Sequence, residues 1–114
     1  MLYIANKGKT VICNHTFLDS GMSHKVVIST ENANAEITIG DNCYIGCQVY
    51  AGEKVTIGDA CIIAGGVAIC DNDGHSPSVD RKKRHTSNSK IKPVQIGNNV
   101  WICARSIVQR PNNR

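Results

Sequence analysis

The chain has 114 residues and a formal net charge of +4 at pH 7. This length indicates one domain, and the mild positive excess, concentrated in one segment, does not indicate a nucleic-acid partner. With only 4% aromatic residues, the sequence favours a core of stacked small aliphatic side chains over an aromatic cluster.

The distribution of apolar residues along the chain indicates the expected cellular compartment. No run of about 18 apolar residues occurs, so we expect no membrane insertion. The first nine residues contain no apolar core of the kind that a signal peptide needs. The expected compartment is therefore the cytoplasm.

The first part of the chain, residues 1–38, has short apolar stretches without a constant spacing. Ile12, Leu18 and the run Lys-Val-Val-Ile-Ser-Thr at 25–30 are typical of strands, but the sixfold spacing slips near residues 30–35. We predict an irregular coil here that caps one end of a repetitive fold, because a terminal repeat must cover its open face.

From Ile39 onward the spacing becomes a strict six-residue repeat. An aliphatic residue or alanine opens every unit, and the openers are Ile39, Ile45, Ala51, Ile57, Ile63 and Ile69. Glycine follows four of the six openers, and a small apolar residue comes four places after most of them. Neither a helix nor a simple alternating strand has this period. The pattern predicts a solenoid of very short strands, three units to a coil.

The repeat stops at His75 and returns at Ile96, which matches Ile57 in its surroundings. These two isoleucines are 39 residues apart, whereas one coil takes 18, so 21 residues have been inserted. We therefore expect residues 76–93 to leave the solenoid as an extruded loop and residues 94–110 to form the last coil. A regular scaffold that is interrupted once, beside a histidine, is a candidate site for chemistry.

Together these segments predict an all-β, single-domain chain over residues 1–114, with three to five coils of parallel β-helix. Regular coils are expected over 39–75. Cys43 and Cys61 share one inward position, where cysteine acts as a small hydrophobe. The Cys43–Cys47 spacing lacks a second Cys or His pair, so no metal site is expected.

The repeat is the hexapeptide signature of the left-handed parallel β-helix, and the sequence resembles the hexapeptide-repeat acyltransferases of the sugar and polysaccharide O-acetyltransferase type. The resemblance covers about residues 25–108. Its most specific parts are Ile69–His75, which matches the family's Asp-x-Asp-x-His turn, and Val94–Ile102. It implies left-handed coiling, a homotrimer with sites between subunits, and transfer of an acetyl group from acetyl-coenzyme A to a saccharide hydroxyl.

The predicted general base is His75, which matches the family's catalytic histidine. Imidazole, with an ordinary pKa of about 6.5, can take a hydroxyl proton near neutral pH. Asp71 and Asp73 could hold the imidazole tautomer or raise its basicity, with Asp73 slightly preferred. The run Asp-Asn-Asp-Gly is also a common turn sequence, so the competing interpretation is that both aspartates only stabilise a turn.

The resemblance implies that Trp101 and Ala104 bind acetyl-coenzyme A and that Tyr44 lies on the acceptor side. Trp101 stands between two inward positions, so its indole should point outward, against the cofactor or a neighbouring subunit. The basic run at 81–85 either meets coenzyme A phosphates or an anionic saccharide, or is a solvated loop.

Two other classes share this fold. The γ-type carbonic anhydrases need three histidines around zinc, and the spacing of the four histidines gives no convincing third ligand. A non-catalytic scaffold or assembly protein is the main alternative, because related enzymes continue for further coils after the tryptophan turn.

Overall fold

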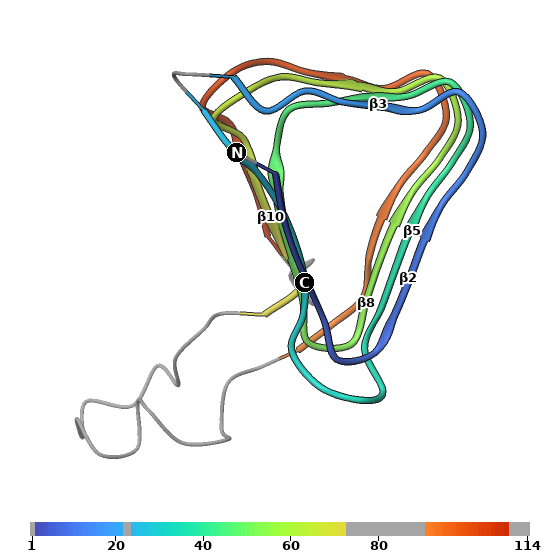
Figure 1. The fold of residues 1–114 in the computed structure, drawn as a ribbon, viewed down its shortest axis with the longest axis vertical. Coiled ribbons are helices and arrows are strands. Elements are labelled where there is room, and N and C mark those ends of the chain that lie inside the picture. The colour runs from blue at the N-terminus through green and yellow to red at the C-terminus, as the bar shows by residue number, and fades with distance from the viewer. Residues whose placement is uncertain (1, 22–23, 73–90, 110–114) are drawn as a thin grey trace, which may run out of the picture.

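A computed structural model describes residues 2–21, 24–72 and 91–109, and there the chain winds into a prism of triangular outline (Figure 1). The described residues form thirteen short strands and no helix. The strands are β1 (Leu2–Asn6), β2 (Lys9–Ile12), β3 (Phe17–Leu18), β4 (Val26–Thr30), β5 (Glu36–Ile39), β6 (Tyr44–Ile45), β7 (Gln48–Ala51), β8 (Lys54–Ile57), β9 (Ile62–Ile63), β10 (Ala68–Cys70), β11 (Val94–Ile96), β12 (Trp101–Ile102) and β13 (Ile107–Val108).

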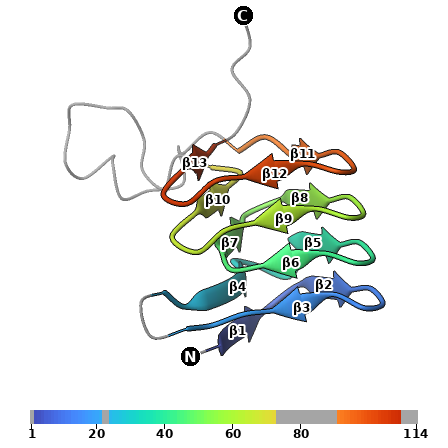
Figure 2. The same ribbon diagram turned by 90° about the horizontal axis from the view of Figure 1, so that it is seen from above.

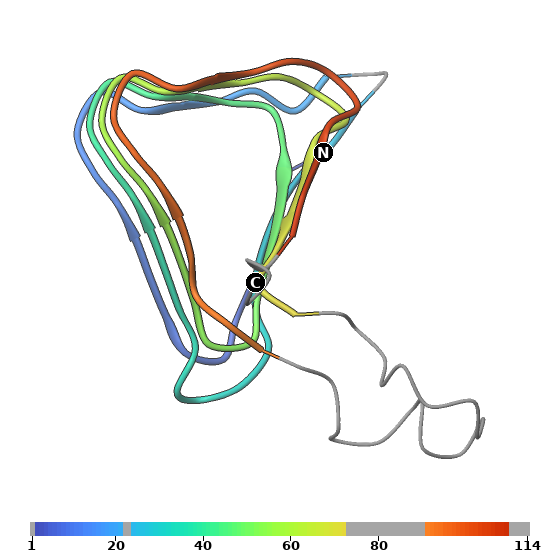
Figure 3. The same ribbon diagram turned by 180° about the vertical axis from the view of Figure 1, so that it is seen from behind.

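Each face of the prism is one parallel sheet. The strand orders are β1-β4-β7-β10-β13, β11-β8-β5-β2 and β12-β9-β6-β3, so each strand pairs with its counterpart one coil away. Coil 1 comprises β1–β3, coil 2 β4–β6, coil 3 β7–β9 and coil 4 β10–β12, and β13 begins a fifth (Figure 2). The chain climbs from coil 1 with a left-handed turn (Figures 1 and 2), and Figure 3 shows the same outline from the other end. The predicted all-β, left-handed parallel β-helix is confirmed.

The core consists of apolar columns that run along the stack. Ile39 pairs with Ile57, which pairs with Ile96, and all three are buried. Ile45, Ile63 and Ile102 form the next column, as the six-residue period predicts. In-register parallel pairing places equivalent side chains above one another at about 4.8 Å, so the same residue type recurs at each level.

The cysteines behave as small core residues. The thiols of Cys43 and Cys61 are buried, and each donates a hydrogen bond to a backbone carbonyl of the next coil, Gly58 O and Gly97 O, both at 3.1 Å. Burial raises the pKa of the Cys43 thiol and raises that of Cys47 to about 12. All six cysteines are free thiols.

One corner of the prism is held by a ladder of hydrogen bonds. The Asp59 carboxylate accepts the backbone N–H of Asp41 in the coil below at 2.8 Å, and the Asn98 side chain accepts the N–H of Asp59 at 2.8 Å. A Cβ at Gly40 would collide with Asp59 Oδ1, and one at Gly58 would collide with Asn98 Oδ1. Positions 40 and 58 are therefore glycine because a side chain of the next coil occupies the space that their Cβ atoms would take.

The expected cap at residues 1–38 contains a complete coil together with β4 and most of β5. Strand β1 pairs with β4 over five residues, and β2 pairs with β5 over four. The irregularity lies in the connections at 19–25 and 31–35, which are long enough to shift the six-residue spacing without breaking the strand register. Coil 1 is at one end of the stack, which leaves Leu2 and Ile4 about half exposed.

The expected loop at 76–93 lies mostly outside the described residues. At its two ends, Asn72 and Ile91 form an antiparallel bridge, and the N–H of Lys92 donates to the carbonyl of Asp71 at 2.9 Å. The chain therefore leaves coil 4 after β10 and rejoins it at β11 beside the point of departure. After the loop, the first strand is β11, which begins at Val94.

Candidate functional site

The residues predicted from the sequence fall into three places in the structure. His75, Asp73 and the basic run at 81–85 lie outside the described residues. Asp71 is at the corner where the chain leaves the stack. Trp101, Ala104 and Tyr44 lie on or next to one face of the prism.

Asp71 is completely buried and fully engaged with the backbone. Its Oδ1 accepts the N–H of Gly52, and its Oδ2 accepts those of Glu53 and Lys54, all at 2.7 Å. The side-chain amide of Asn72 also donates to Oδ1, at 3.0 Å. A carboxylate with these partners anchors the turn of coil 3 beneath it, and this anchor lies four residues before His75.

The outer face of the sheet β12-β9-β6-β3 carries a column of apolar and aromatic side chains. Phe17, Tyr44, Ile62 and Trp101 occupy equivalent positions in successive coils. Trp101 is 72% exposed, so its side chain points out of the prism as the pattern predicted. The rings of Phe17 and Tyr44 stack at 5.9 Å between centroids. An exposed aromatic column on a flat sheet is a surface suited to a ligand or a second subunit.

Tyr44 belongs to a polar network at one end of this face. Its hydroxyl donates a short hydrogen bond to Asp19 Oδ2, which raises the pKa of the Tyr44 phenol. The carbonyl oxygen of Asp19 lies 2.9 Å from Nε2 of His24. Because the Asp19 carboxylate holds it, the Tyr44 hydroxyl has a fixed direction and keeps its two acceptor lone pairs.

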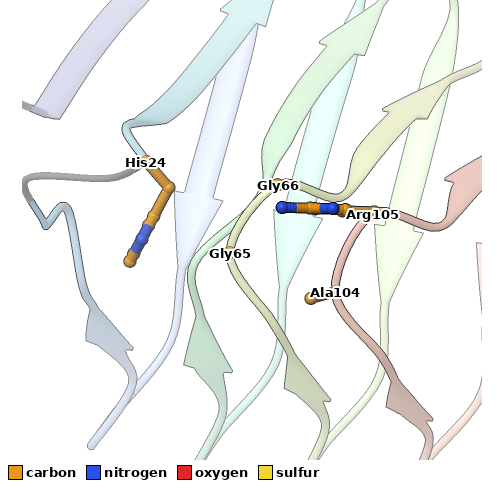
Figure 4. A pocket seen from close by; sticks show the side chains of 5 residues that line it. All are labelled: His24, Gly65, Gly66, Ala104 and Arg105. Atoms are coloured by element: carbon orange, nitrogen blue, oxygen red, sulfur yellow. The ribbon is translucent and has the colours of Figure 1, made fainter.

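A hollow of about 360 Å³ opens at the corner between this face and the sheet that contains β10. Its lining residues are His24, Gly65, Gly66, Ala104 and Arg105 (Figure 4). Ala104, which was predicted from the resemblance to contact the cofactor, is thus in the wall of this hollow.

Differences in turn length explain how the hollow forms. Only two residues join β6 to β7, whereas four join β9 to β10 and four join β12 to β13. The imidazole of His24 reaches past the short turn and packs on Gly65, where a Cβ would lie 2.7 Å from the ring. Arg105, in the left-handed conformation with φ of 67°, lies beside Gly66 (Figure 4).

The electrostatic character of the hollow is basic. Arg105 supplies a permanent positive charge, and no carboxylate is among the lining residues. The His24 imidazole covers Gly65, whereas Gly66 has only Arg105 near it, so a thin polar chain could pass close to the backbone at Gly66. The part of the chain that is described contains no group of three His, Cys, Asp or Glu residues able to hold a metal ion.

Sequence reasoning missed Arg105, His24 and Asp19. The Gly65-Gly66 pair was a visible signal, because it breaks the usual composition of the repeat at a turn. Arg105 could have been found as its counterpart one coil later. Nothing in the spacing could have found His24, because it lies in an irregular connection of the first coil.

These features define the class as a parallel β-helix built from hexapeptide repeats. Residues 36–71 match the family model described as "Bacterial transferase hexapeptide (six repeats)". The match extends from β5 to the end of β10, which is less than half of the chain. Searches of curated proteins and of solved structures returned no match. No helix in the described ranges is long and apolar enough to cross a membrane.

Proposed function

We propose that this protein is an acetyl-coenzyme A-dependent O-acetyltransferase that acts on a hydroxyl of a sugar or polysaccharide. The observation that carries the proposal is the basic hollow, lined by Gly66, Ala104 and Arg105, at the turn that follows β12, the strand of Trp101. The match of residues 36–71 to transferase hexapeptide repeats supports a transferase role in general.

The hollow fits the chemistry of coenzyme A. Arg105, with its fixed guanidinium, could form charge-assisted hydrogen bonds with a phosphate. The absence of a side chain at Gly66 leaves room for a narrow pantetheine arm beside Ala104. The exposed indole of Trp101 offers a flat apolar face immediately before this turn. Acetyl-coenzyme A is a substrate here, and no metal takes part in the proposed binding.

In the proposed reaction, His75 takes the proton from the sugar hydroxyl. At the same time, the oxygen of that hydroxyl attacks the thioester carbonyl carbon of acetyl-coenzyme A. The carbon–sulfur bond then breaks, and the coenzyme A thiolate takes the proton back from the imidazolium. The products are an acetyl ester and free coenzyme A. Asp73 would orient the imidazole, whereas Asp71 would hold the turn from which the catalytic segment departs.

The acceptor is proposed to lie along the outer face near Tyr44, whose hydroxyl can accept a hydrogen bond from a sugar while it donates to Asp19. The same face has the exposed apolar column, so we propose a homotrimer in which each site is shared by two subunits. Hexapeptide-repeat proteins commonly form trimers, which supports this assembly.

The test is acetyl-coenzyme A consumption, followed as free thiol, with a panel of hydroxylated sugars and wild-type protein first. Calorimetry would measure binding of acetyl-coenzyme A separately. Arg105→Ala should weaken binding by about 10–100-fold, the effect of losing one or two charge-assisted hydrogen bonds. Lys54→Ala is the matched control, because Lys54 is an exposed cation on another face.

The scaffold alternative makes a different prediction. A wild-type protein that neither binds nor consumes acetyl-coenzyme A at millimolar concentration would rule out the enzyme and favour a non-catalytic β-helix. Binding without turnover on any sugar would keep the cofactor site and overturn the choice of acceptor.

A further inference from the structure

Asp19, the residue that follows β3, makes contacts that join two parts of the candidate site. Its carboxylate Oδ2 accepts the hydroxyl proton of Tyr44. Its carbonyl oxygen, which can only accept, takes a hydrogen bond from Nε2–H of His24 at 2.9 Å, and His24 borders the hollow (Figure 4). Its own N–H donates to the carbonyl of Ile45 at 2.9 Å, which fixes its backbone against β6. One residue therefore connects Tyr44 with the wall of the hollow.

The Tyr44 hydroxyl is held in place from both the ring and the oxygen. The ring stacks on that of Phe17, with 5.9 Å between centroids and 28° between planes. Strand pairing places Phe17 one coil below Tyr44 and Ile62 one coil above, in a single column. Because neighbours flank the ring and Asp19 binds the hydroxyl, the phenol is arranged before a ligand arrives. A group that is already ordered loses little entropy on binding.

The contact with Asp19 also determines which hydrogen bonds Tyr44 can offer to a ligand. A phenol has one proton, and a carboxylate has none to give in return. With that proton directed at Asp19, the Tyr44 oxygen meets a ligand only as an acceptor. The matching ligand group is a donor such as a hydroxyl, because an ether or carboxylate oxygen would face lone pairs with no proton between them.

The proposed reaction sets a further condition on this donor. The reacting hydroxyl gives its only proton to His75, so it cannot donate the same proton to Tyr44. The hydroxyl that binds Tyr44 must therefore be a second one on the same acceptor molecule. An acceptor with a single hydroxyl cannot satisfy both residues.

We propose that Asp19 is a positioning residue that makes Tyr44 a hydrogen-bond acceptor only, so that the acceptor sugar must offer Tyr44 a second hydroxyl besides the one that reacts. The ligand class is a saccharide with at least two free hydroxyls. The inference rests on the proposed function for the identity of the reacting hydroxyl. The contact with Tyr44 belongs to binding alone, so it can be tested without acetyl-coenzyme A.

The first test is the titration of Tyr44 in the protein without ligand. NMR of protein with 13Cζ-labelled tyrosine follows the phenols of the three tyrosines separately. The hydrogen bond to Asp19 raises the pKa of the Tyr44 phenol, so Asp19→Ala should lower that pKa toward the ordinary value of about 10. Tyr50, whose hydroxyl donates to Gln48 Oε1 at 2.9 Å on another face, should titrate as in the wild type.

The second test is the binding of the methyl glycosides of glucose, galactose and mannose, measured by ligand-observed NMR. At least one of them should shift the Tyr44 Cζ resonance saturably. For that glycoside, removal of the hydroxyl that contacts Tyr44 should weaken binding by about 3–10-fold, the effect of one neutral hydrogen bond. Replacement of the same hydroxyl by fluorine should weaken binding equally, because fluorine cannot donate a hydrogen bond.

Tyr44→Phe provides the matched comparison. This variant should bind the parent glycoside about 3–10-fold more weakly and should no longer distinguish it from the deoxy and fluoro analogues. A purely structural role of Tyr44 would weaken all three ligands in proportion and keep the differences between them. Tyr50→Phe, which removes a bonded phenol from another face, should bind like wild type. Circular dichroism spectra that match wild type would show that the variants fold.

The proposal is overturned if no glycoside shifts the Tyr44 resonance, or if the fluoro analogue binds like the parent, which would make Tyr44 the donor. A Tyr44→Phe variant that keeps the penalty for the deoxy analogue would also overturn it, as would an unchanged Tyr44 pKa in Asp19→Ala. Binding with all the expected signatures, but without acetyl transfer, would support the role of Asp19 and reject the proposed enzyme. The two failures are therefore distinguishable.

Discussion

The carboxylate of Asp59 accepts the backbone N–H of Asp41 across one coil and thereby fills the space beside Gly40. The hydrogen bond between the Asp59 side chain and the Asp41 backbone therefore leaves room only for glycine at position 40. This relationship, repeated along one corner, couples the stability of each coil to the coil above it.

Gly40→Ala should lower the free energy of unfolding by roughly 1–3 kcal/mol, the usual cost of forcing an extra methyl group into a packed site. The new Cβ would meet both the Asp59 carboxylate and the carbonyl of Gly58. Urea unfolding measures the effect, and Gly97→Ala is the control, because no atom of the described residues lies within 4 Å of a Cβ at that position. Equal denaturation midpoints for the two variants would contradict the packing argument.

Asp71→Asn should destabilise the fold by about 3 kcal/mol. The substitution replaces one of two acceptor oxygens with a donor that faces backbone N–H groups, and hydrogen bonds to a charged group contribute about 1.5–3 kcal/mol. Asp59→Asn is the matched control and should cost little, because Asn98 fills the same ladder position with an amide oxygen. If both variants unfold at the wild-type urea concentration, Asp71 is not an anchor.

His75→Ala should reduce turnover by about 10²–10⁴-fold if His75 is the general base. The affinity for acetyl-coenzyme A and the number of subunits in the assembly should stay unchanged, because the substitution removes only the proton acceptor. His85→Ala, a histidine within the predicted loop, is the control and should keep nearly full activity. A His75→Ala enzyme with wild-type kcat would assign the base to another residue.

Trp101→Ala should raise the dissociation constant for acetyl-coenzyme A more than it lowers kcat. The indole is mostly exposed in one chain, so its removal costs the fold little. Calorimetry gives the affinity, and light scattering shows whether the variant still forms the proposed trimer. Unchanged affinity with loss of the trimer would place Trp101 in a subunit interface instead of the cofactor site.

Alkylation of the native protein should modify Cys103 first and Cys47 last. Cys103 is exposed, whereas burial raises the pKa of Cys47 to about 12. A raised pKa lowers the thiolate fraction at pH 8, and the thiolate is the reactive form. Mass spectrometry of digests over time gives the order, and early labelling of Cys47 would show that the core opens more readily than this packing allows.

The six-residue period by itself determined the scaffold. Because three units make a coil and parallel pairing repeats each level, the sequence was enough to align Ile39, Ile57 and Ile96 despite the inserted loop. The outward direction of Trp101 and the burial of Cys43 and Cys61 follow from the same periodicity. The anchoring of Asp71 on the turn at 52–54 could also have been derived, since Asp71 stands one coil length after Glu53.

The site depended on contacts that no period encodes. Asp19 and His24 lie in an irregular connection, so only the folded chain shows that one holds Tyr44 and the other borders the hollow with Arg105. Strand register is set locally by repeating hydrogen bonds, and it can therefore be derived from the sequence. The reach of a turn side chain depends on turn length and packing across several coils, and only the tertiary structure decides it.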